Sequence, residues 1–304
     1  MYEAHDPRSQ LKSKAAPVAG SGAAFAAAEY VKFDELPPSE SAPEADTWYA
    51  RGQNFVVAYS RVQPGASFVR RGQPDEFMLV LPEAGDGAVI EAGGESVAIS
   101  GYTLAIIPPG DSTITLRQAG TLVRVFSSST ADIAARAANA AGYASAHPHI
   151  PPYQTWPVPP GGFRIRHYSL DVPPVPGRFG RIWRCTTMMI NVLPFEPAPR
   201  DTTKLSPHHH DDFEQGSLAL QGAFVHHIRW PWTADQRAWR NDDHEHCPAP
   251  SLAVIPPPAI HTSAATRTDG NQLVDIFAPP RTDFSKMPGW VLNADEYPMP
   301  ETGG

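Results

Sequence analysis

The sequence contains an internal repeat, and this repeat restricts the chain to a small number of folds. Residues 104–109 read LAIIPP, and residues 252–257 read LAVIPP, 148 positions later. Glu76 and the apolar run that follows it are matched by Glu214 and its own run, 138 positions later. A pattern that returns in the same order indicates one duplicated unit, so we expect two similar domains instead of two unrelated ones.

Each copy of the repeat has the pattern of an all-β domain. Short β-branched and aliphatic runs alternate with Gly, Pro and Asp turns, as in sandwiches and small barrels. The chain has 34 prolines, which argue against a helical bundle because each interior proline removes a helix hydrogen bond. The predicted strands are 54–62, 76–81, 87–91, 102–107 and 121–126 in the first copy, and 163–170, 182–193, 213–220, 223–230, 252–255 and 271–277 in the second.

A helix and a linker are predicted between the two copies. The Ala-rich segment from Thr130 to Gly142 begins with a suitable N-cap and ends with a suitable stop, so it predicts a short helix. Residues 147–160 are rich in proline and predict a stiff, extended linker.

Charge and cysteine usage exclude several functional classes. The chain has 24 Lys+Arg against 32 Asp+Glu, a formal charge of −8, so we expect neither nucleic acid nor an anionic membrane surface as partner. Cys185 and Cys247 form no CxxC pair, which excludes a disulfide framework and a thiolate zinc site and favours the reducing cytoplasm. Residues 15–28 are too weakly apolar to span a bilayer, although with the two lysines before them they loosely resemble a secretory signal.

The densest group of chemically active side chains lies in residues 207–214, which read PHHHDDFE. On a strand, His208 and His210 project to one face, and Glu214 has the same parity. His261, which follows the second Pro-rich repeat segment, is a candidate fourth ligand. Imidazole and carboxylate together suit Fe(II), Mn(II), Ni(II), Cu(II) or Zn(II) and leave coordination positions open for substrate or oxygen.

The spacing of these residues resembles the two motifs of the cupin superfamily. HxH, three residues, Glu214, an apolar strand and Gly222 are similar to the first motif, and Ser251 to His261 are similar to the second. The chain departs from the family pattern by one extra residue before Gly222 and by Pro258 where a glycine is usual. The resemblance covers roughly residues 50 to 280.

The resemblance implies an all-β bicupin, with two tandem double-stranded β-helix (jelly-roll) barrels joined by a short helix and a Pro-rich linker. It implies one divalent transition metal, Fe(II) favoured, held by His208, His210, Glu214 and His261. The expected divisions are an N-terminal arm (1–45) that packs on a barrel or is mobile, a metal-free barrel (46–129), the helix and linker (130–162), a metal-binding barrel (163–285) and a C-terminal tail (286–304).

The first copy lacks the metal ligands. Superposing the repeats places Arg70 at His208, Gly72 at His210, Glu76 at Glu214 and Thr113 at His261. A single carboxylate beside an arginine does not hold a transition metal, so we expect the N-terminal barrel to be structural, as a dimer contact or as a lid over the other barrel.

Weaker signals indicate residues that contact substrate. His226 and His227 are adjacent on one predicted strand, so only one of them faces the barrel interior. Arg166 is a candidate carboxylate or phenolate donor, and Trp230 is a candidate stacking surface at the barrel mouth. The cluster Asp242 to Cys247 contains a second HxH, which we interpret as part of a solvated loop in preference to a lid or an accessory metal site.

The leading functional hypothesis is a metal-dependent dioxygenase acting on a small aromatic or enolisable oxygenated substrate, with O2 as co-substrate. In this hypothesis Glu214 is a ligand or the catalytic base. The alternatives are a redox-neutral isomerase, lyase or decarboxylase that uses the metal as a Lewis acid, and a binding barrel without turnover. A homodimer is a mild expectation from the family resemblance.

Overall fold

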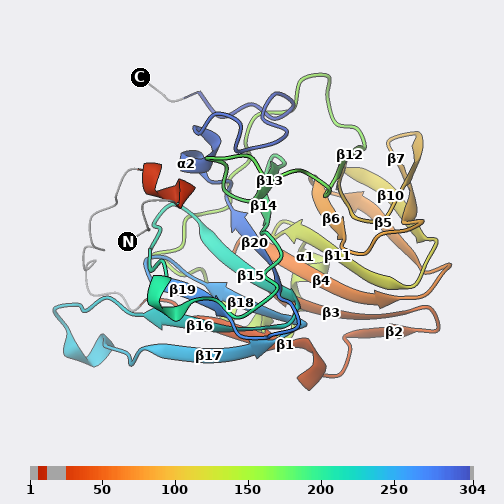
Figure 1. Ribbon diagram of the computed structural model, residues 1–304. Coiled ribbons are helices and arrows are strands. Elements are labelled where there is room, and N and C mark those ends of the chain that lie inside the picture. Colours follow the sequence, from red (N-terminus) through yellow and green to blue (C-terminus); the bar gives the residue numbers. More distant parts are fainter. Residues whose placement is uncertain (1–5, 12–24, 302–304) are drawn as a thin grey trace.

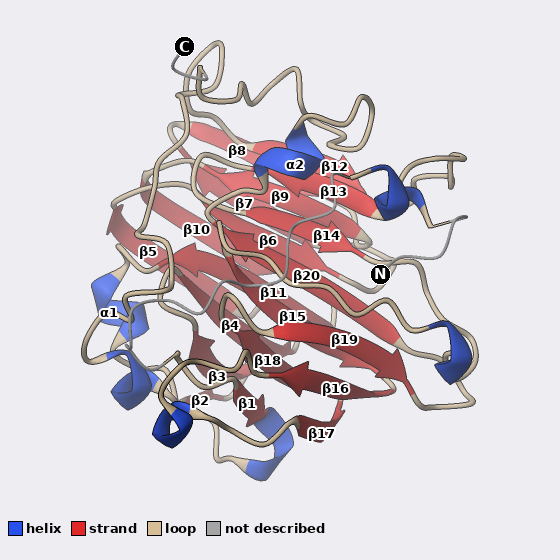
Figure 2. Cartoon of the chain, turned by 90° about the vertical axis from the view of Figure 1, so that its left-hand side faces the viewer, coloured by secondary structure: helices blue, strands red, loops and turns tan. Residues whose placement is uncertain are grey.

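The computed structural model describes residues 6–11 and 25–301, and within them the chain folds into two β-barrels. The N barrel is formed by a seven-stranded and a four-stranded antiparallel sheet, and the C barrel by a six-stranded and a three-stranded one. Figure 1 shows the two barrels side by side, and Figure 2 shows that the short helices lie at the periphery of the sheets. The predicted all-β, two-barrel fold is confirmed.

The seven-stranded sheet runs in the order β12 (Arg166–Ser169), β9 (Thr103–Ile107), β6 (Phe77–Leu81), β11 (Gly120–Ser127), β4 (Phe55–Val62), β3 (Ala45–Arg51), β2 (Glu40–Ala42). The four-stranded sheet runs β5 (Ser67–Gln73), β10 (Gly110–Leu116), β7 (Ala88–Ala92), β8 (Glu95–Ile99). The six-stranded sheet runs β1 (Glu29–Lys32), β18 (Ser251–Ile255), β15 (Glu214–Gln221), β20 (Gln272–Ala278), β14 (Met189–Val192), β13 (Arg181–Arg184). The three-stranded sheet runs β17 (Asp243–Pro248), β16 (Ala223–Arg229), β19 (Ile260–Ala265).

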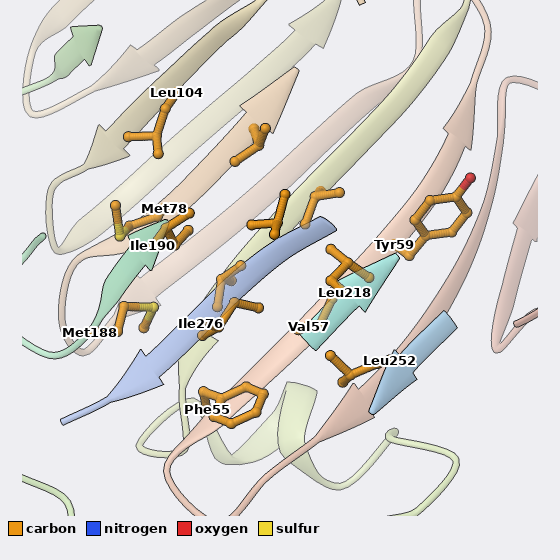
Figure 3. Packing of buried hydrophobic residues seen from close by; sticks show 14 of the residues in the cluster. Phe55, Val57, Tyr59, Met78, Leu104, Met188, Ile190, Leu218, Leu252 and Ile276 are labelled. Atoms are coloured by element: carbon orange, nitrogen blue, oxygen red, sulfur yellow. The ribbon is translucent and has the colours of Figure 1, made fainter. Parts of the chain in front are cut away.

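The two large sheets pack face to face and bury the core that joins the barrels. Val57 of β4 lies in one cluster with Leu218 of β15 and Ile276 of β20 (Figure 3). Because side chains alternate along a strand, the residues between these face the interior of their own barrel. A Cβ at Gly216 would lie 2.7 Å from the Phe55 ring, so the two sheets approach too closely there for any larger residue.

Strand pairing confirms the internal repeat. In the N barrel Phe77 of β6 faces Ile107 of β9, and in the C barrel Gln215 of β15 faces Ile255 of β18. Gln215 lies 138 positions after Phe77, and Ile255 lies 148 positions after Ile107, as the sequence repeat requires. The two sheets therefore have the same register as well as the same strand order in this region.

The two copies exchange one strand each. β1, from the predicted N-terminal arm, pairs with β18 of the C barrel, and β12, from the second copy, pairs with β9 of the N barrel. β1 and β12 occupy equivalent places, 137 positions apart, so the exchange is reciprocal. Part of the predicted arm therefore packs on a barrel, and each barrel contains chain from both copies.

The helix between the copies is shorter than expected. The segment from Thr130 to Gly142 forms only α1 (Ala131–Ala134) and, later, the 3₁₀ turn Ala140–Tyr143. α1 has a counterpart, α2 (Thr282–Ser285), 151 positions later. The helix is thus the last element of each repeat, and its buried residue, Ile133 in α1 and Phe284 in α2, packs into a hydrophobic cluster of its barrel.

Several strands were missed, and one prediction is wrong. Asp242 to Cys247 is not a loop, because Asp243–Pro248 forms β17 and pairs with β16 along its length. Its charged side chains hid the strand, which is an edge strand with one face in solvent. Most of the weakly apolar segment 15–28 lies outside the described residues, and within the described part of the chain we find no helix long and apolar enough to cross a membrane.

Candidate functional site

Three of the predicted ligands meet at one end of the C barrel. His208 forms an isolated antiparallel bridge with His261 at the start of β19, and their rings are 4.4 Å apart between centroids. The ring of His210 lies 5.0 Å from that of His261. The structure thus brings together histidines that are separated by about 50 positions in the sequence.

Each of these histidines is oriented by a backbone carbonyl. The Nδ1 atoms of His208, His210 and His261 lie 2.9, 2.9 and 3.0 Å from the carbonyl oxygens of Ser206, Phe213 and Ala259. An Nδ1–H that donates to a carbonyl leaves Nε2 as the lone-pair nitrogen, which is the arrangement found in metal-binding histidines. The three side chains are therefore oriented as nitrogen ligands.

Burial keeps the imidazoles of His208 and His261 neutral. Removal from water lowers the pKa of His261 to about 4 and lowers the pKa of His208 well below its ordinary value, and the proximity of the other histidines lowers that of His208 further. A neutral imidazole is the form that ligates a metal, so these histidines need lose no proton to bind an ion at neutral pH.

Glu214 does not lie with the histidines, so the expectation of a shared face is wrong. Its Oε2 accepts hydrogen bonds from the backbone N–H groups of Gln53 and Asn54, at 2.7 and 3.2 Å, in the interface between the barrels. A Cβ at Gly52 would collide with this carboxylate, so the glycine makes room for it. The alternation assumed from His208 onward is interrupted by a bend at residues 211–212, before β15 begins.

Gln215 takes the place expected for Glu214. Its Oε1 lies 3.3 Å from Nε2 of His261, on the face of β15 that points into the C barrel. Gln215 is also separated from Gly222 by one residue fewer than Glu214 is, so the extra residue noted before Gly222 was the signal for this shift.

A cavity of about 240 Å³ adjoins these residues inside the C barrel. Its walls include His208, His261, Gln215 and Asp275 of β20. Asp275 is buried, and its Oδ1 accepts a hydrogen bond of 2.7 Å from the Ser217 hydroxyl. Burial raises the pKa of Asp275 to about 6, although the hydrogen bond from Ser217 opposes the rise. The cavity therefore contains a carboxyl group that can exchange a proton near neutral pH.

An arginine lines the same cavity. Arg200 is held in place by hydrogen bonds from its guanidinium to the Ser206 hydroxyl and the Ser263 carbonyl, both 3.0 Å long. Burial and the nearby Arg8 lower its pKa, so the site favours an anion that neutralises this charge. Arg200 lies outside any strand, and no motif in the sequence marks it.

The adjacent histidines on β16 point in opposite directions. His226 faces the barrel interior, where Nδ1 lies 2.8 Å from the Ser263 hydroxyl, and burial lowers its pKa to about 3. His227 faces outward, and its Nδ1 lies 2.8 Å from Nδ1 of His244 on β17. Of the two, only His226 is on the side of the candidate site.

Two other predicted substrate contacts lie elsewhere. Trp230 is buried against Ile228, Ile255 and Ala259 and does not line the cavity. Arg166 is on the exchanged strand β12, where its Nε pairs with Glu296 at 3.2 Å. These side chains lie at the barrel end and at the junction between the barrels, outside the candidate cavity, so their contact with substrate stays a prediction that the cavity does not support.

The donor set fits a divalent transition metal in its chemistry. Three oriented imidazoles and an amide oxygen suit the ions named from the sequence. In residues 6–11 and 25–301, no three His, Cys, Asp or Glu side chains already close around one point. Side-chain adjustment at His208, His210 and His261 would accompany the binding of an ion.

Comparison with known proteins identifies the fold. No protein-family model and no curated protein matches the sequence. An oxalate decarboxylase from Lactobacillus farciminis, solved as a formate complex, has a TM-score of 0.55 and 15% identity, over 86% of this chain and 88% of that one. Another oxalate decarboxylase structure, from work on substrate binding and a switch of reaction specificity, has a TM-score of 0.54 and 13% identity, over 95% and 88%.

Proposed function

Since the chain has the two-barrel cupin fold, we propose that it is a metal-dependent enzyme whose active site is the C-barrel cavity, and that it removes CO2 from a small oxygenated carboxylic acid. The observation that carries the proposal is one cavity lined by two carbonyl-oriented histidines, His208 and His261, together with Asp275 and Arg200, while the similarly oriented His210 lies next to His261. A divalent transition metal held by His208, His210 and His261 would supply a Lewis acid for a substrate oxygen.

Arg200 binds the substrate in this proposal. Its guanidinium is already oriented by Ser206 and Ser263, so less conformational entropy is lost when it pairs with a carboxylate. Phe224 and Leu273 form an apolar wall of the same cavity and exclude water from the reacting carbon.

Asp275 supplies the proton. Loss of CO2 breaks a C–C bond and leaves its electron pair on the remaining carbon, which then needs one proton. The protonated Asp275 carboxyl can donate it, and Ser217 stabilises the carboxylate that remains. The pKa of about 6 leaves a fraction of the carboxyl protonated near neutral pH.

A dioxygenase is the second candidate, because Phe179 and Phe224 give the cavity an aromatic lining that suits an aromatic or enolisable substrate. Trp230 does not support this candidate, since its ring lies outside the cavity.

The test is a screen of small carboxylic, 2-oxo and phenolic acids with protein loaded in turn with Mn(II), Fe(II) and Zn(II). CO2 release that persists without O2 supports decarboxylation, whereas stoichiometric O2 uptake supports the dioxygenase. Binding of a metal without any turnover across the screen would contradict both and favour a binding barrel.

A further inference from the structure

A second pair of histidines lies outside the barrel, on the outer face of the three-stranded sheet. His227 of β16 and His244 of β17 are directly opposite each other in the strand pairing, and their Nδ1 atoms are 2.8 Å apart. The rings are inclined by 63°, with centroids 5.0 Å apart. His244 is exposed and His227 is partly buried, so the pair is open to solvent at the edge of the molecule where β16 and β17 lie (Figure 1).

We propose that His227 and His244 form a surface metal site that takes a borderline divalent cation, with Cu(II) bound more tightly than Zn(II) or Ni(II). Imidazole nitrogens bind such ions at roughly 2.0–2.1 Å, so two nitrogens in neighbouring coordination positions lie about 3 Å apart. The observed separation of the two Nδ1 atoms is within a few tenths of an ångström of that distance. The strand pairing therefore holds the two imidazoles at chelate spacing, and the rings turn from each other toward the ion when it binds.

The proton balance permits binding at neutral pH. In the unbound pair one imidazole donates its Nδ1–H to the Nδ1 lone pair of the other. When a cation enters, the donor ring moves its hydrogen to Nε2, the other neutral tautomer, and both Nδ1 lone pairs face the ion. Removal from water and the neighbouring His244 lower the pKa of His227, which favours the neutral form.

The charged side chains beside the histidine pair are paired with each other, so they do not repel a cation. Asp242 accepts two hydrogen bonds from Arg229, at 2.9 and 2.8 Å, so the arginine charge beside the pair is neutralised. A groove of about 160 Å³, lined in part by Thr262, adjoins the pair and has room for the waters that would complete the coordination. The pair lies on the opposite face of the sheet from His226, although the groove beside it also reaches His261 of the barrel site.

The test is a Cu(II) titration of the full-length, untagged protein, followed by electron paramagnetic resonance and equilibrium dialysis. His227→Asn and His244→Asn should each weaken the surface site by about 10–100-fold and remove its nitrogen hyperfine signal. His246→Asn is the matched control, because His246 is on the same face of β17 but is opposite Val225 instead of an imidazole. It should leave the signal unchanged.

A second background separates this site from the barrel cavity. In protein carrying His208→Ala and His261→Ala, the surface signal should persist, and adding His227→Asn should abolish it. Circular dichroism confirms that each variant is folded. If His227→Asn keeps the wild-type stoichiometry, or if His246→Asn loses as much as His244→Asn, the chelate is refuted, whatever the outcome for the proposed enzyme.

Discussion

The two barrels share strand order and register but differ in what fills them. The N barrel places Phe77, Leu79 and Ile90 in its interior, where the C barrel has Gln215, Ser217 and His226 at the equivalent positions. Apolar side chains close the first interior as a packed core, and polar side chains leave a cavity in the second. The same scaffold thus holds a packed core in one copy and a polar cavity in the other.

The N-barrel positions equivalent to the candidate site residues also carry side chains that serve packing or ion pairing. Arg70, the counterpart of His208, forms hydrogen bonds of 2.6 and 3.0 Å with Asp132 on α1, so an ion pair stands where the histidine stands in the other copy. Arg124 occupies the place of Asp275 and stacks over the Phe68 ring. The counterpart of His261 is Ser112, not Thr113 as the sequence alignment indicated, because an irregularity between Gly110 and Ser112 shifts the register by one.

One residue is retained in both copies for a reason unrelated to metal. Glu76 accepts hydrogen bonds from the backbone N–H and hydroxyl of Thr186, and Glu214 accepts from the backbone N–H of Gln53. Gln53 and Thr186 are themselves equivalent, each four residues before the paired strand positions Val57 and Ile190. The two glutamates therefore form a pseudo-symmetric pair of contacts across the barrel interface, and this explains why only the carboxylate survived in the first copy.

The largest expected effect is the loss of metal from one barrel only. His261→Ala should weaken metal binding by about 100-fold or more and abolish turnover. Loss of a residue that only hydrogen-bonds to a metal ligand already weakens binding by about 10–100-fold, and loss of the ligand itself should cost at least as much. Ser112→Ala, at the equivalent place in the N barrel, should change neither. Elemental analysis and activity measurements on both variants check this, and equal metal in wild type and His261→Ala would contradict the proposed site.

The next effect separates proton transfer from binding. Asp275→Asn should lower kcat by roughly 10²–10⁴-fold while metal content stays unchanged. With Asp275 as proton donor, wild-type activity falls as the pH rises through about 6. Ser217→Ala removes the hydrogen bond that lowers this pKa, so its pH–rate profile should move to higher pH. An unmoved profile would exclude Asp275 as the donor.

A core substitution should affect stability and leave the site intact. Leu79→Ala in the packed N barrel should lower the free energy of unfolding by about 2–5 kcal/mol, since it leaves a cavity among buried side chains. Ser217→Ala, at the equivalent position in the C barrel, should cost about 1–3 kcal/mol, mostly through its hydrogen bond to Asp275. Chemical denaturation compares the two, and a loss of metal in Leu79→Ala would show that the barrels are more strongly coupled than we infer.

The smallest effect concerns the interface glutamates. Burial raises the pKa of Glu214 to about 7 from 4.5, so its protonated form is favoured in the folded state. Its contribution to stability is therefore present at low pH and is lost as the pH rises from about 4.5 to about 7, by at most about 3 kcal/mol. Denaturation curves of wild type and Glu214→Gln should diverge across this range, with the variant the more stable near pH 7.

Glu76→Gln is the matched control for that measurement. Both oxygens of Glu76 accept hydrogen bonds, from Thr186 and from the Tyr297 hydroxyl, whereas Oε1 of Glu214 is buried without a hydrogen-bond partner among the described residues. In Glu76→Gln the amide nitrogen would face one of the groups that donate to Glu76 in the wild type, so this variant should be less stable than wild type. If the two variants changed the free energy of unfolding equally, the difference in hydrogen bonding between Glu76 and Glu214 would have no effect on stability.

The sequence alone was enough to predict the fold class, the duplication and the three histidines that meet in the C barrel. These follow from local patterns: strand-length apolar runs, a repeated segment and a fixed spacing of His208 and His210. The repeat also showed that the first copy lacks the histidines. The apolar pattern of the sequence did not reveal strands that are rich in charged residues, such as β17. An edge strand needs apolar residues on one face only, so its pattern is weak.

Tertiary structure decided which side chains share a space. A bend at residues 211–212 turned Glu214 to the barrel interface and Gln215 to the cavity, and strand alternation cannot be carried across such a bend. Asp275 and Arg200 reached the cavity through sheet pairing and a loop path, neither of which the local sequence encodes. The exchange of β1 and β12 is likewise a non-local choice, because each strand satisfies its backbone hydrogen bonds on the other copy's barrel.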